Sequence, residues 1–141
     1  METTNTLTQQ EQQYPSLATR YKSYFIDIVF MIVIMFVVSD LMPDSAPAPV
    51  RIGAFFIIWL MYEPFMSSIV GCTLGNYFTG IRVRKFSDPS QKINILQAYI
   101  RVILKYSLGY ISFFTITGNK ERRAIHDLVS GSVMISVENT N

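Results

Sequence analysis

Two long apolar segments dominate the pattern of hydrophobic and polar positions along the chain. The first runs over residues 24–42 and has no polar side chain between positions 28 and 38. As a helix it rises about 28 Å, close to the thickness of the hydrocarbon core of a bilayer. The second runs over residues 52–70 and has the same length. The pattern therefore predicts two membrane-spanning helices.

The stretch between the two segments is rich in proline, with Pro43, Pro47 and Pro49. Proline at this density ends a helix and suits a short exposed connector, so the two spans are predicted to form an antiparallel hairpin. Lys and Arg concentrate on the cytoplasmic side of short loops. Here they lie before the first span and after the second: Arg20, Lys22, Arg82, Arg84, Lys85 and Lys92. The N-terminus is therefore expected in the cytoplasm and the proline-rich loop outside.

A third apolar segment, residues 93–117, is too irregular for a simple span. Its first half has apolar residues on one helical face and polar residues off it, as in an interfacial helix. Residues 106–116 are apolar but cover only about 16 Å as a helix. A single crossing would place the basic cluster at 120–123 outside, so a re-entrant or interfacial helix with a cytoplasmic C-terminus is favoured. The alternative is one tilted spanning helix over 95–116.

Residues 81–84 and 132–137 alternate apolar and polar positions, which predicts two short strands on the cytoplasmic side. The expected fold is therefore a membrane all-α protein: a two-span helical hairpin, a re-entrant, interfacial or third spanning helix, and a small cytoplasmic β-ribbon. Residues 1–19 are expected to be a disordered polar tail, 20–137 the membrane domain, and 138–141 a C-terminal tail.

Composition narrows the function. Hydrophobic residues make up 50% of the chain and charged residues 16%, against roughly 25% charged in soluble domains. A net charge of +2 gives no argument for a nucleic-acid partner. One cysteine and one histidine argue against an internal disulfide and a metal site. No nucleophile and base stand at a usable spacing, so we expect neither an enzyme nor a cofactor.

Two acids fall inside the spans. Asp27 lies about 5 Å along the first helix from Tyr24, and Glu63 about 10 Å from the inner end of the second, so both are expected in the inner leaflet. Two carboxylates in a low-dielectric site cannot both ionise cheaply, which suits exchange of a proton for a cation. The alternative, favoured because buried charges are usually paired, is neutralisation by structural cations. Those cations are Arg20, Lys22, Arg101, Lys105 and Arg122.

His126 and Asp127 are adjacent, so on a helix they point about 100° apart and do not orient each other as an acid–base pair. Asp127 is expected to cap a helix or to pair with Arg82 or Arg101. His126 is a candidate pH sensor, although a structural role is favoured. The basic strand residues Arg82, Arg84 and Lys85 are expected to contact anionic lipid headgroups.

Several of these residues together resemble the RDD family of small bacterial membrane proteins. In chain order they are Arg20, Asp27, Glu63, Thr73-Leu74-Gly75, Gly80-Ile81-Arg82-Val83, Arg101 and the run from His126 to Val133. The family is named for an arginine and two aspartates, which correspond here to Arg20, Asp27 and Asp127. The resemblance covers residues 20–137 and implies a location in the bacterial inner membrane. The family usually has lysine after Thr-Leu-Gly, whereas this chain has Asn76, so the role of that lysine does not carry over.

Some RDD members are implicated in sodium/proton exchange, which the two intramembrane acids would suit. The sequence thus favours proton-coupled cation transport through Asp27 and Glu63, tuned by Arg20 and Arg101. The rival is a non-transporting scaffold or partner-binding subunit in which the same charges fix the helices. The expected partners are the lipid bilayer, sodium ions and protons, and further copies or a larger membrane complex, because so small a chain cannot enclose a pathway alone.

Overall fold

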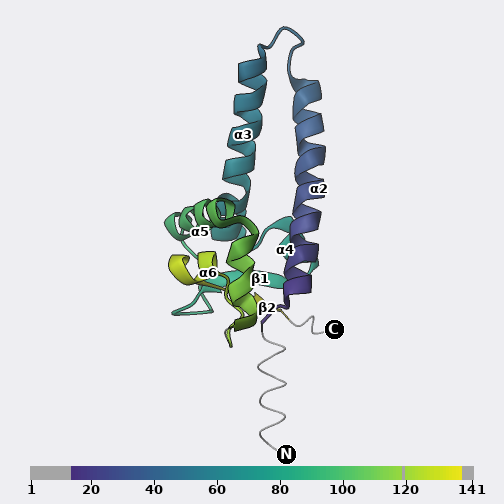
Figure 1. Cartoon of the computed structure of the whole chain (residues 1–141). Helices are drawn as coiled ribbons and strands as arrows, with labels where there is room; N and C mark the ends of the chain where they lie inside the picture. Colours follow the sequence, from purple (N-terminus) through teal and green to yellow (C-terminus); the bar gives the residue numbers. More distant parts are fainter. Residues whose placement is uncertain (1–13, 119, 138–141) are drawn as a thin grey trace, which may run out of the picture.

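The structure is a computed structural model that describes residues 14–118 and 120–137. Its elements follow in the order α2 (Leu17–Leu41), α3 (Ala48–Phe65), η1 (Met66–Val70), α4 (Leu74–Phe78), β1 (Ile81–Lys85), α5 (Ile95–Leu108), η2 (Gly109–Gly118), α6 (Ile125–Ser130) and β2 (Ser132–Ser136). Helices α2 and α3 stand as a long hairpin, and the remaining elements gather around its lower end (Figure 1). We call this lower part, residues 71–118 and 120–137, the base.

The helix α2 begins at Leu17, inside the stretch that the sequence analysis assigned to the N-terminal tail. The side chain of Ser16 accepts a hydrogen bond from the backbone N–H of Thr19 at 3.2 Å and so caps the helix. The preceding residues 1–13 and the predicted C-terminal tail lie outside the described residues.

The hairpin carries large apolar side chains on its surface. Phe25 is 68% exposed, Phe36 74%, Leu41 79% and Phe56 73%. Such a surface is unfavourable in water, and hydrocarbon is the solvent that covers it at no cost. Among the described residues, two helical segments are long and apolar enough to cross a membrane, Leu17–Leu41 and Ala48–Val70. The two predicted spans are therefore confirmed as candidate membrane-spanning helices.

The second span ends in an irregular turn. Pro64 lies inside α3, and the helix continues beyond Phe65 as the π-helical segment η1. Gly71 then ends it with a positive φ of 87°. Within this turn Ser68 donates its hydroxyl to the carbonyl oxygen of Pro64 at 2.8 Å.

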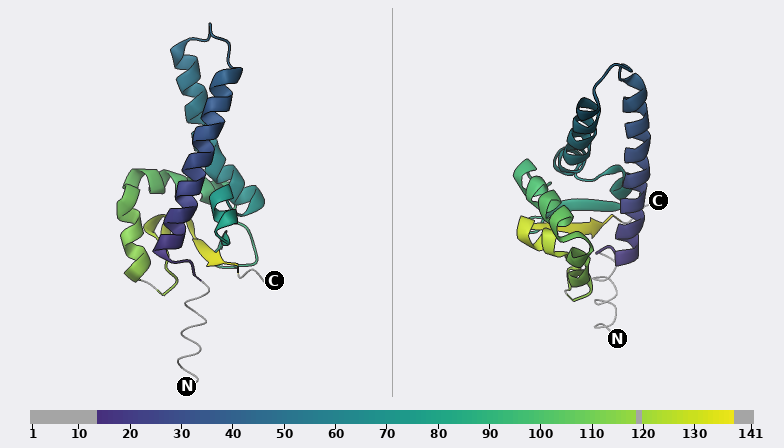
Figure 2. Two further views of the ribbon diagram at one scale, coloured as in Figure 1. Left: turned by 90° about the vertical axis from the view of Figure 1, so that its right-hand side faces the viewer. Right: turned by 45° about the horizontal axis from the view of Figure 1, so that its top comes forward.

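The third apolar segment forms two short helices and not one long helix. Helix α5 lies across the lower end of the hairpin, and η2 runs away from the hairpin along the base (Figures 1 and 2). Gly109 ends α5 with a φ of 52°. The alternative of one tilted helix over 95–116 is therefore wrong, because the backbone of Gly109 interrupts it. As expected, α5 is amphipathic: Leu96 and Ile103 are exposed, while Ala98 and Val102 are buried.

The predicted β-ribbon is present. Strands β1 and β2 pair antiparallel, with Ile81 opposite Ser136 and Lys85 opposite Ser132. Ile81 and Val83 of β1 and Met134 of β2 pack with Ile93 and Ala98 in a small core in the base. Gly80 and Val137 close one end of the ribbon through a hydrogen bond of 2.7 Å.

Candidate functional site

Three distant segments meet at the carboxylate of Asp127, which is fully buried in α6. Arg20 of α2 donates Nη1 to Oδ2 at 2.8 Å, and Arg101 of α5 donates Nε to Oδ1 at 2.9 Å. Arg20 also donates Nη2 to the carbonyl oxygen of Arg122. Within the base, Ser132 donates its hydroxyl to Asp127 at 3.2 Å. This acid therefore fastens the first span to the base.

The neighbours of Asp127 keep it charged. Burial alone raises the pKa of its carboxyl, but the neighbouring His126, Arg101 and Arg20, in that order, lower it and together outweigh burial. The pKa is therefore held well below its usual range. Of the two arginines that the sequence analysis named for Asp127, Arg101 is its partner, whereas Arg82 lies over the ring of Tyr77 at 5.1 Å.

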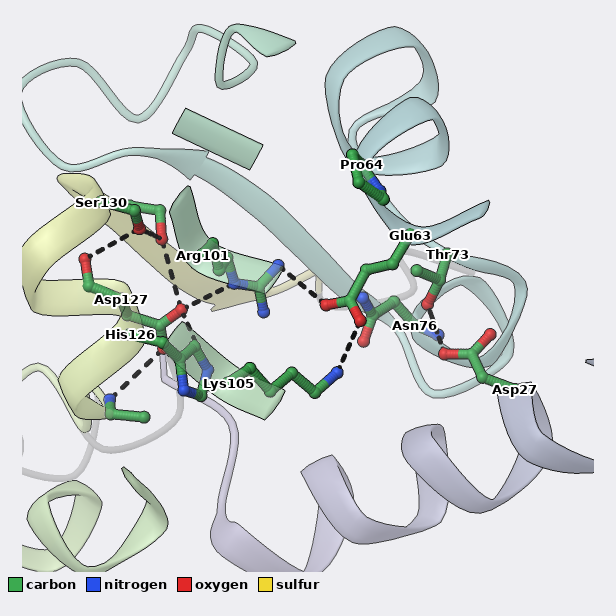
Figure 3. Close-up of polar contacts among 12 residues, drawn as sticks. Asp27, Glu63, Pro64, Thr73, Asn76, Arg101, Lys105, His126, Asp127 and Ser130 are labelled. Atoms are coloured by element: carbon green, nitrogen blue, oxygen red, sulfur yellow. Dashed lines mark hydrogen bonds and ion pairs between the residues drawn. The ribbon is translucent and has the colours of Figure 1, made fainter. Parts of the chain in front are cut away.

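Glu63, near the end of α3, is buried and paired with cations (Figure 3). Lys105 donates Nζ to Oε2 at 2.8 Å. Arg101 places Nη1 3.9 Å from Oε1, too far for a hydrogen bond, and this buried Nη1 has no hydrogen-bond partner among the described residues. Charges thus alternate along one chain of contacts, in the order Arg20, Asp127, Arg101, Glu63 and Lys105.

Asp27 is held by neutral donors. Its carboxylate accepts hydrogen bonds from the Tyr62 hydroxyl at 2.8 Å, the Thr73 hydroxyl at 2.6 Å and the backbone N–H of Gly75 at 2.8 Å. Among the described residues, no Lys or Arg lies within ion-pair distance of Asp27. The two acids therefore differ: Glu63 has the structural cations that the sequence analysis allowed for both, and Asp27 does not.

The Thr-Leu-Gly run at 73–75 has a physical role in this contact. Thr73 caps the N-terminus of α4 by accepting a hydrogen bond from the backbone N–H of Asn76 at 3.2 Å. Gly75 packs directly against α2, where a Cβ atom would collide with the carbonyl oxygen of Ser23 and lie 2.8 Å from Asp27 Oδ2. Only glycine allows this close approach.

A cavity of about 30 Å³, lined mostly by polar and charged residues, lies between the two acids. Its lining includes both carboxylates, Arg101, Lys105 and Asn76, which accepts a hydrogen bond from the Ser23 hydroxyl at 2.6 Å. A second cavity of about 20 Å³ lies beside Trp59, Tyr62 and Tyr106. Each is large enough for one or two water molecules or a small ion. Five residues line both cavities: Tyr24, Asp27, Glu63, Thr73 and Lys105.

His126 is almost fully buried, and its Nε2 lies 3.6 Å from Asp127 Oδ1. Burial lowers the pKa of His126 to about 4, with Arg101 and Lys105 reinforcing the shift against the opposing effect of Asp127. The unfolded chain therefore binds a proton more readily, and this group reduces the free energy of unfolding as pH falls from about 6.5 to about 4. A sensing role for His126 would act in that acidic range.

The residues named for lipid headgroups make contacts within the base. Arg84 donates Nη1 to the carbonyl oxygens of Val83 at 3.1 Å and Gly71 at 3.5 Å, and Lys85 donates Nζ to Gln91 at 3.1 Å. Lys92 donates Nζ to the carbonyl oxygen of Ile69 at 2.6 Å. Arg84 and Lys92 thus lie at the last carbonyls of the second span, where positive charge stabilises a helix end.

Sequence reasoning did not identify Ser23 and Tyr62 as parts of this site. No motif marks them, because a serine or tyrosine in an apolar helix is as often a packing or interfacial residue. Lys105 was named only as one cation in reach of the acids, and the structure places it on Glu63.

Neither a curated protein nor a solved structure matches the chain at a significant level. A family model described as the RDD family matches residues 14–131, from just before α2 to the glycine that follows α6. The matched region contains every residue of the buried charge network and both acids of the hairpin. The chain therefore belongs to the RDD family.

Proposed function

We propose that the protein exchanges a monovalent cation, sodium in the first instance, for protons across the bacterial inner membrane, with Asp27 as the cation-binding carboxylate. The observation that carries the proposal is that Asp27 lines the cavity between the two acids and has no Lys or Arg within ion-pair distance among the described residues. Asp27 is half-buried, and a carboxylate partly removed from water without a fixed counter-charge favours a bound cation.

The groups around Asp27 suit a hard cation. The Thr73 and Tyr62 hydroxyls already touch the carboxylate, so carboxylate and hydroxyl oxygens lie together at the cavity. The resemblance implies a lysine after Thr-Leu-Gly in most of the family, and this chain has the neutral Asn76 there. A diffusible cation is then the natural counter-charge at Asp27.

The paired charges hold this site in place. Arg20 and Arg101 join α2 and α5 to Asp127, and Glu63 adds a second carboxylate beside the cavity. We propose that these residues position Asp27 and tune the potential that a cation meets. They would take no part in an enzymatic reaction.

The proposed topology places both termini and the base in the cytoplasm and the proline-rich loop outside, with α5 at the membrane interface. Exposed apolar residues on α5, such as Leu96 and Ile103, suit that interfacial position. Two helices cannot enclose a pathway, so we propose that the chain works as a homo-oligomer or in a larger membrane complex.

The experiment is transport in proteoliposomes that carry a pH gradient and an internal pH dye. Sodium chloride, compared with choline chloride at equal ionic strength, is expected to dissipate the gradient with the wild-type protein. Asp27→Asn is expected to reduce the sodium-dependent rate at least about tenfold, because the binding charge is lost. Asn76→Lys is also expected to reduce the sodium-dependent rate, because the lysine would supply a fixed positive charge near Asp27. The exposed loop residue Asp44 provides the control, Asp44→Asn, which should transport normally.

Wild-type vesicles that respond equally to sodium and choline would rule the exchange out. The second candidate is then a membrane scaffold. The ion pairs that run without a gap from Arg20 to Lys105 favour it, because these charges balance one another without a ligand. A scaffold predicts no sodium-dependent signal in any variant, and loss of folding where a paired charge is removed.

A further inference from the structure

We propose that the ammonium group of Lys105 is a tethered competitor for the cation that binds at Asp27, an inference that rests on the exchange proposed above. In this view Lys105 fills the space between the two acids when no cation is bound, and it withdraws when one enters. Lys105 would then set the cation concentration at which the site fills.

The position of Lys105 supports this role. Its Nζ lies 2.8 Å from Glu63 Oε2 and 4.9 Å above the ring centre of Tyr24. Lys105 and Asp27 line both cavities, so the Lys105 side chain borders the space beside Asp27. In Figure 3 the side chain extends toward the side of the site that holds Glu63, Asn76 and Asp27.

Lys105 is also the cation of the network best able to move. Its side chain is 15% exposed, whereas that of Arg101 is 2% exposed and is fixed to Asp127 through Nε. Lysine is a compact charge on a flexible stem of four carbons, and Lys105 lies in the last turn of α5, before the chain turns at Gly109. It can leave Glu63 without disturbing the contacts of Asp127.

Arg101 supplies the counter-charge that such a movement requires. Its buried Nη1 lies 3.9 Å from Glu63 Oε1 and has no hydrogen-bond partner in the part of the chain that the structure describes. A shift of about 1 Å would bring these atoms to the distance of a charge-assisted hydrogen bond. Glu63 therefore keeps a partner when Lys105 withdraws, and the otherwise unexplained buried donor of Arg101 acquires a function.

Charge balance explains why the two cations exclude each other. The charged and titratable groups that line the same cavity as Lys105 come from four helices: Arg20, Tyr24 and Asp27 from α2, Glu63 from α3, Arg101 from α5 and His126 from α6. With Asp127 included, the three carboxylates of this region match Arg20, Arg101 and Lys105. A further cation in a cavity of about 30 Å³ would leave the region positively charged unless the ammonium group moved away.

The test is the melting temperature of the purified full-length protein in detergent, titrated with sodium chloride against choline chloride at constant ionic strength. A cation that binds the folded state raises the melting temperature, and the titration gives the half-saturating sodium concentration. Lys105→Met keeps the length of the side chain and removes its charge, so we expect this concentration to fall about tenfold. Lys92→Met, which alters a lysine outside the cavity, should leave it unchanged.

A half-saturating concentration in Lys105→Met that equals or exceeds the wild-type value overturns the competitor role. If Lys105→Met does not fold, Lys105→Gln removes the charge but keeps a polar group beside Glu63, and the same fall is expected. If the wild type transports sodium but Lys105→Met has the wild-type half-saturating sodium concentration, the competitor role is refuted and the exchange is not. If sodium binds more tightly to Lys105→Met but the wild type does not transport sodium, the exchange is refuted and the competitor role is not. No response to sodium in either protein refutes both.

Discussion

Asp127→Asn is expected to lower the free energy of unfolding by about 3–5 kcal/mol, the range found when one partner of a buried ion pair is removed. Asparagine keeps the shape of the side chain but leaves the guanidinium groups of Arg20 and Arg101, each almost fully buried, without their acid. The first span would lose its connection to the base. Chemical unfolding in detergent, followed by the fluorescence of the single tryptophan, Trp59, measures the change.

Asp44→Asn is the matched control, because Asp44 is exposed in the loop between the spans, and its effect should stay within about 0.5 kcal/mol. If Asp127→Asn and Asp44→Asn unfold at the same denaturant concentration, Asp127 does not hold the first span to the base.

Gly75→Ala is expected to destabilise the protein by about 3 kcal/mol, at the upper end of overpacking effects. The new methyl group would meet the carbonyl oxygen of Ser23 in α2, which is backbone and cannot rotate away. Helix α4 would have to separate from α2, and the hydrogen bond from the Gly75 N–H to Asp27 would weaken. The same unfolding experiment measures the loss.

Gly53→Ala provides the comparison, since a Cβ atom at Gly53 in α3 meets nothing within 4 Å. Alanine is the better helix former, so this variant should be as stable as the wild type or up to about 1 kcal/mol more stable. Equal stability of Gly75→Ala and Gly53→Ala would show that α2 and α4 do not pack as closely as described.

The sequence was sufficient for the hairpin and the ribbon because their signals are local. Long, predominantly apolar runs predict the spans, because a helix in lipid is apolar along most of its length, and alternation at 81–84 and 132–137 predicts the strands. The membrane domain is predicted to begin at residue 20, whereas α2 begins at Leu17. Ser16 is not recognisable as an N-cap because no Glu or Gln follows three positions later to complete a capping box. The third segment was ambiguous because one residue, Gly109, decides between one helix and two.

The pairing of the charges could not be read from the sequence. Asp127 and Arg20 are separated by 107 positions, and Lys105 and Glu63 by 42. Which acid meets which cation depends on how α5 crosses the lower end of the hairpin, and no local pattern encodes that crossing. The difference between Glu63 and Asp27 follows from this packing, because α5 brings its cations to Glu63 while α4 brings neutral donors to Asp27.

The central claim is that the hairpin crosses the bilayer and places its loop and the base on opposite sides. Cysteine labelling tests it most directly, because the native Cys72 is buried and 1% exposed. Two single variants are compared: Ser45→Cys, in the loop, and Ser90→Cys, in the turn after β1. Cells that make each variant are treated with a maleimide that reaches the outer surface of the membrane but does not cross it. We predict labelling of Ser45→Cys in intact cells and of Ser90→Cys only after the membrane is opened. Labelling of both positions from the same side would contradict the claim.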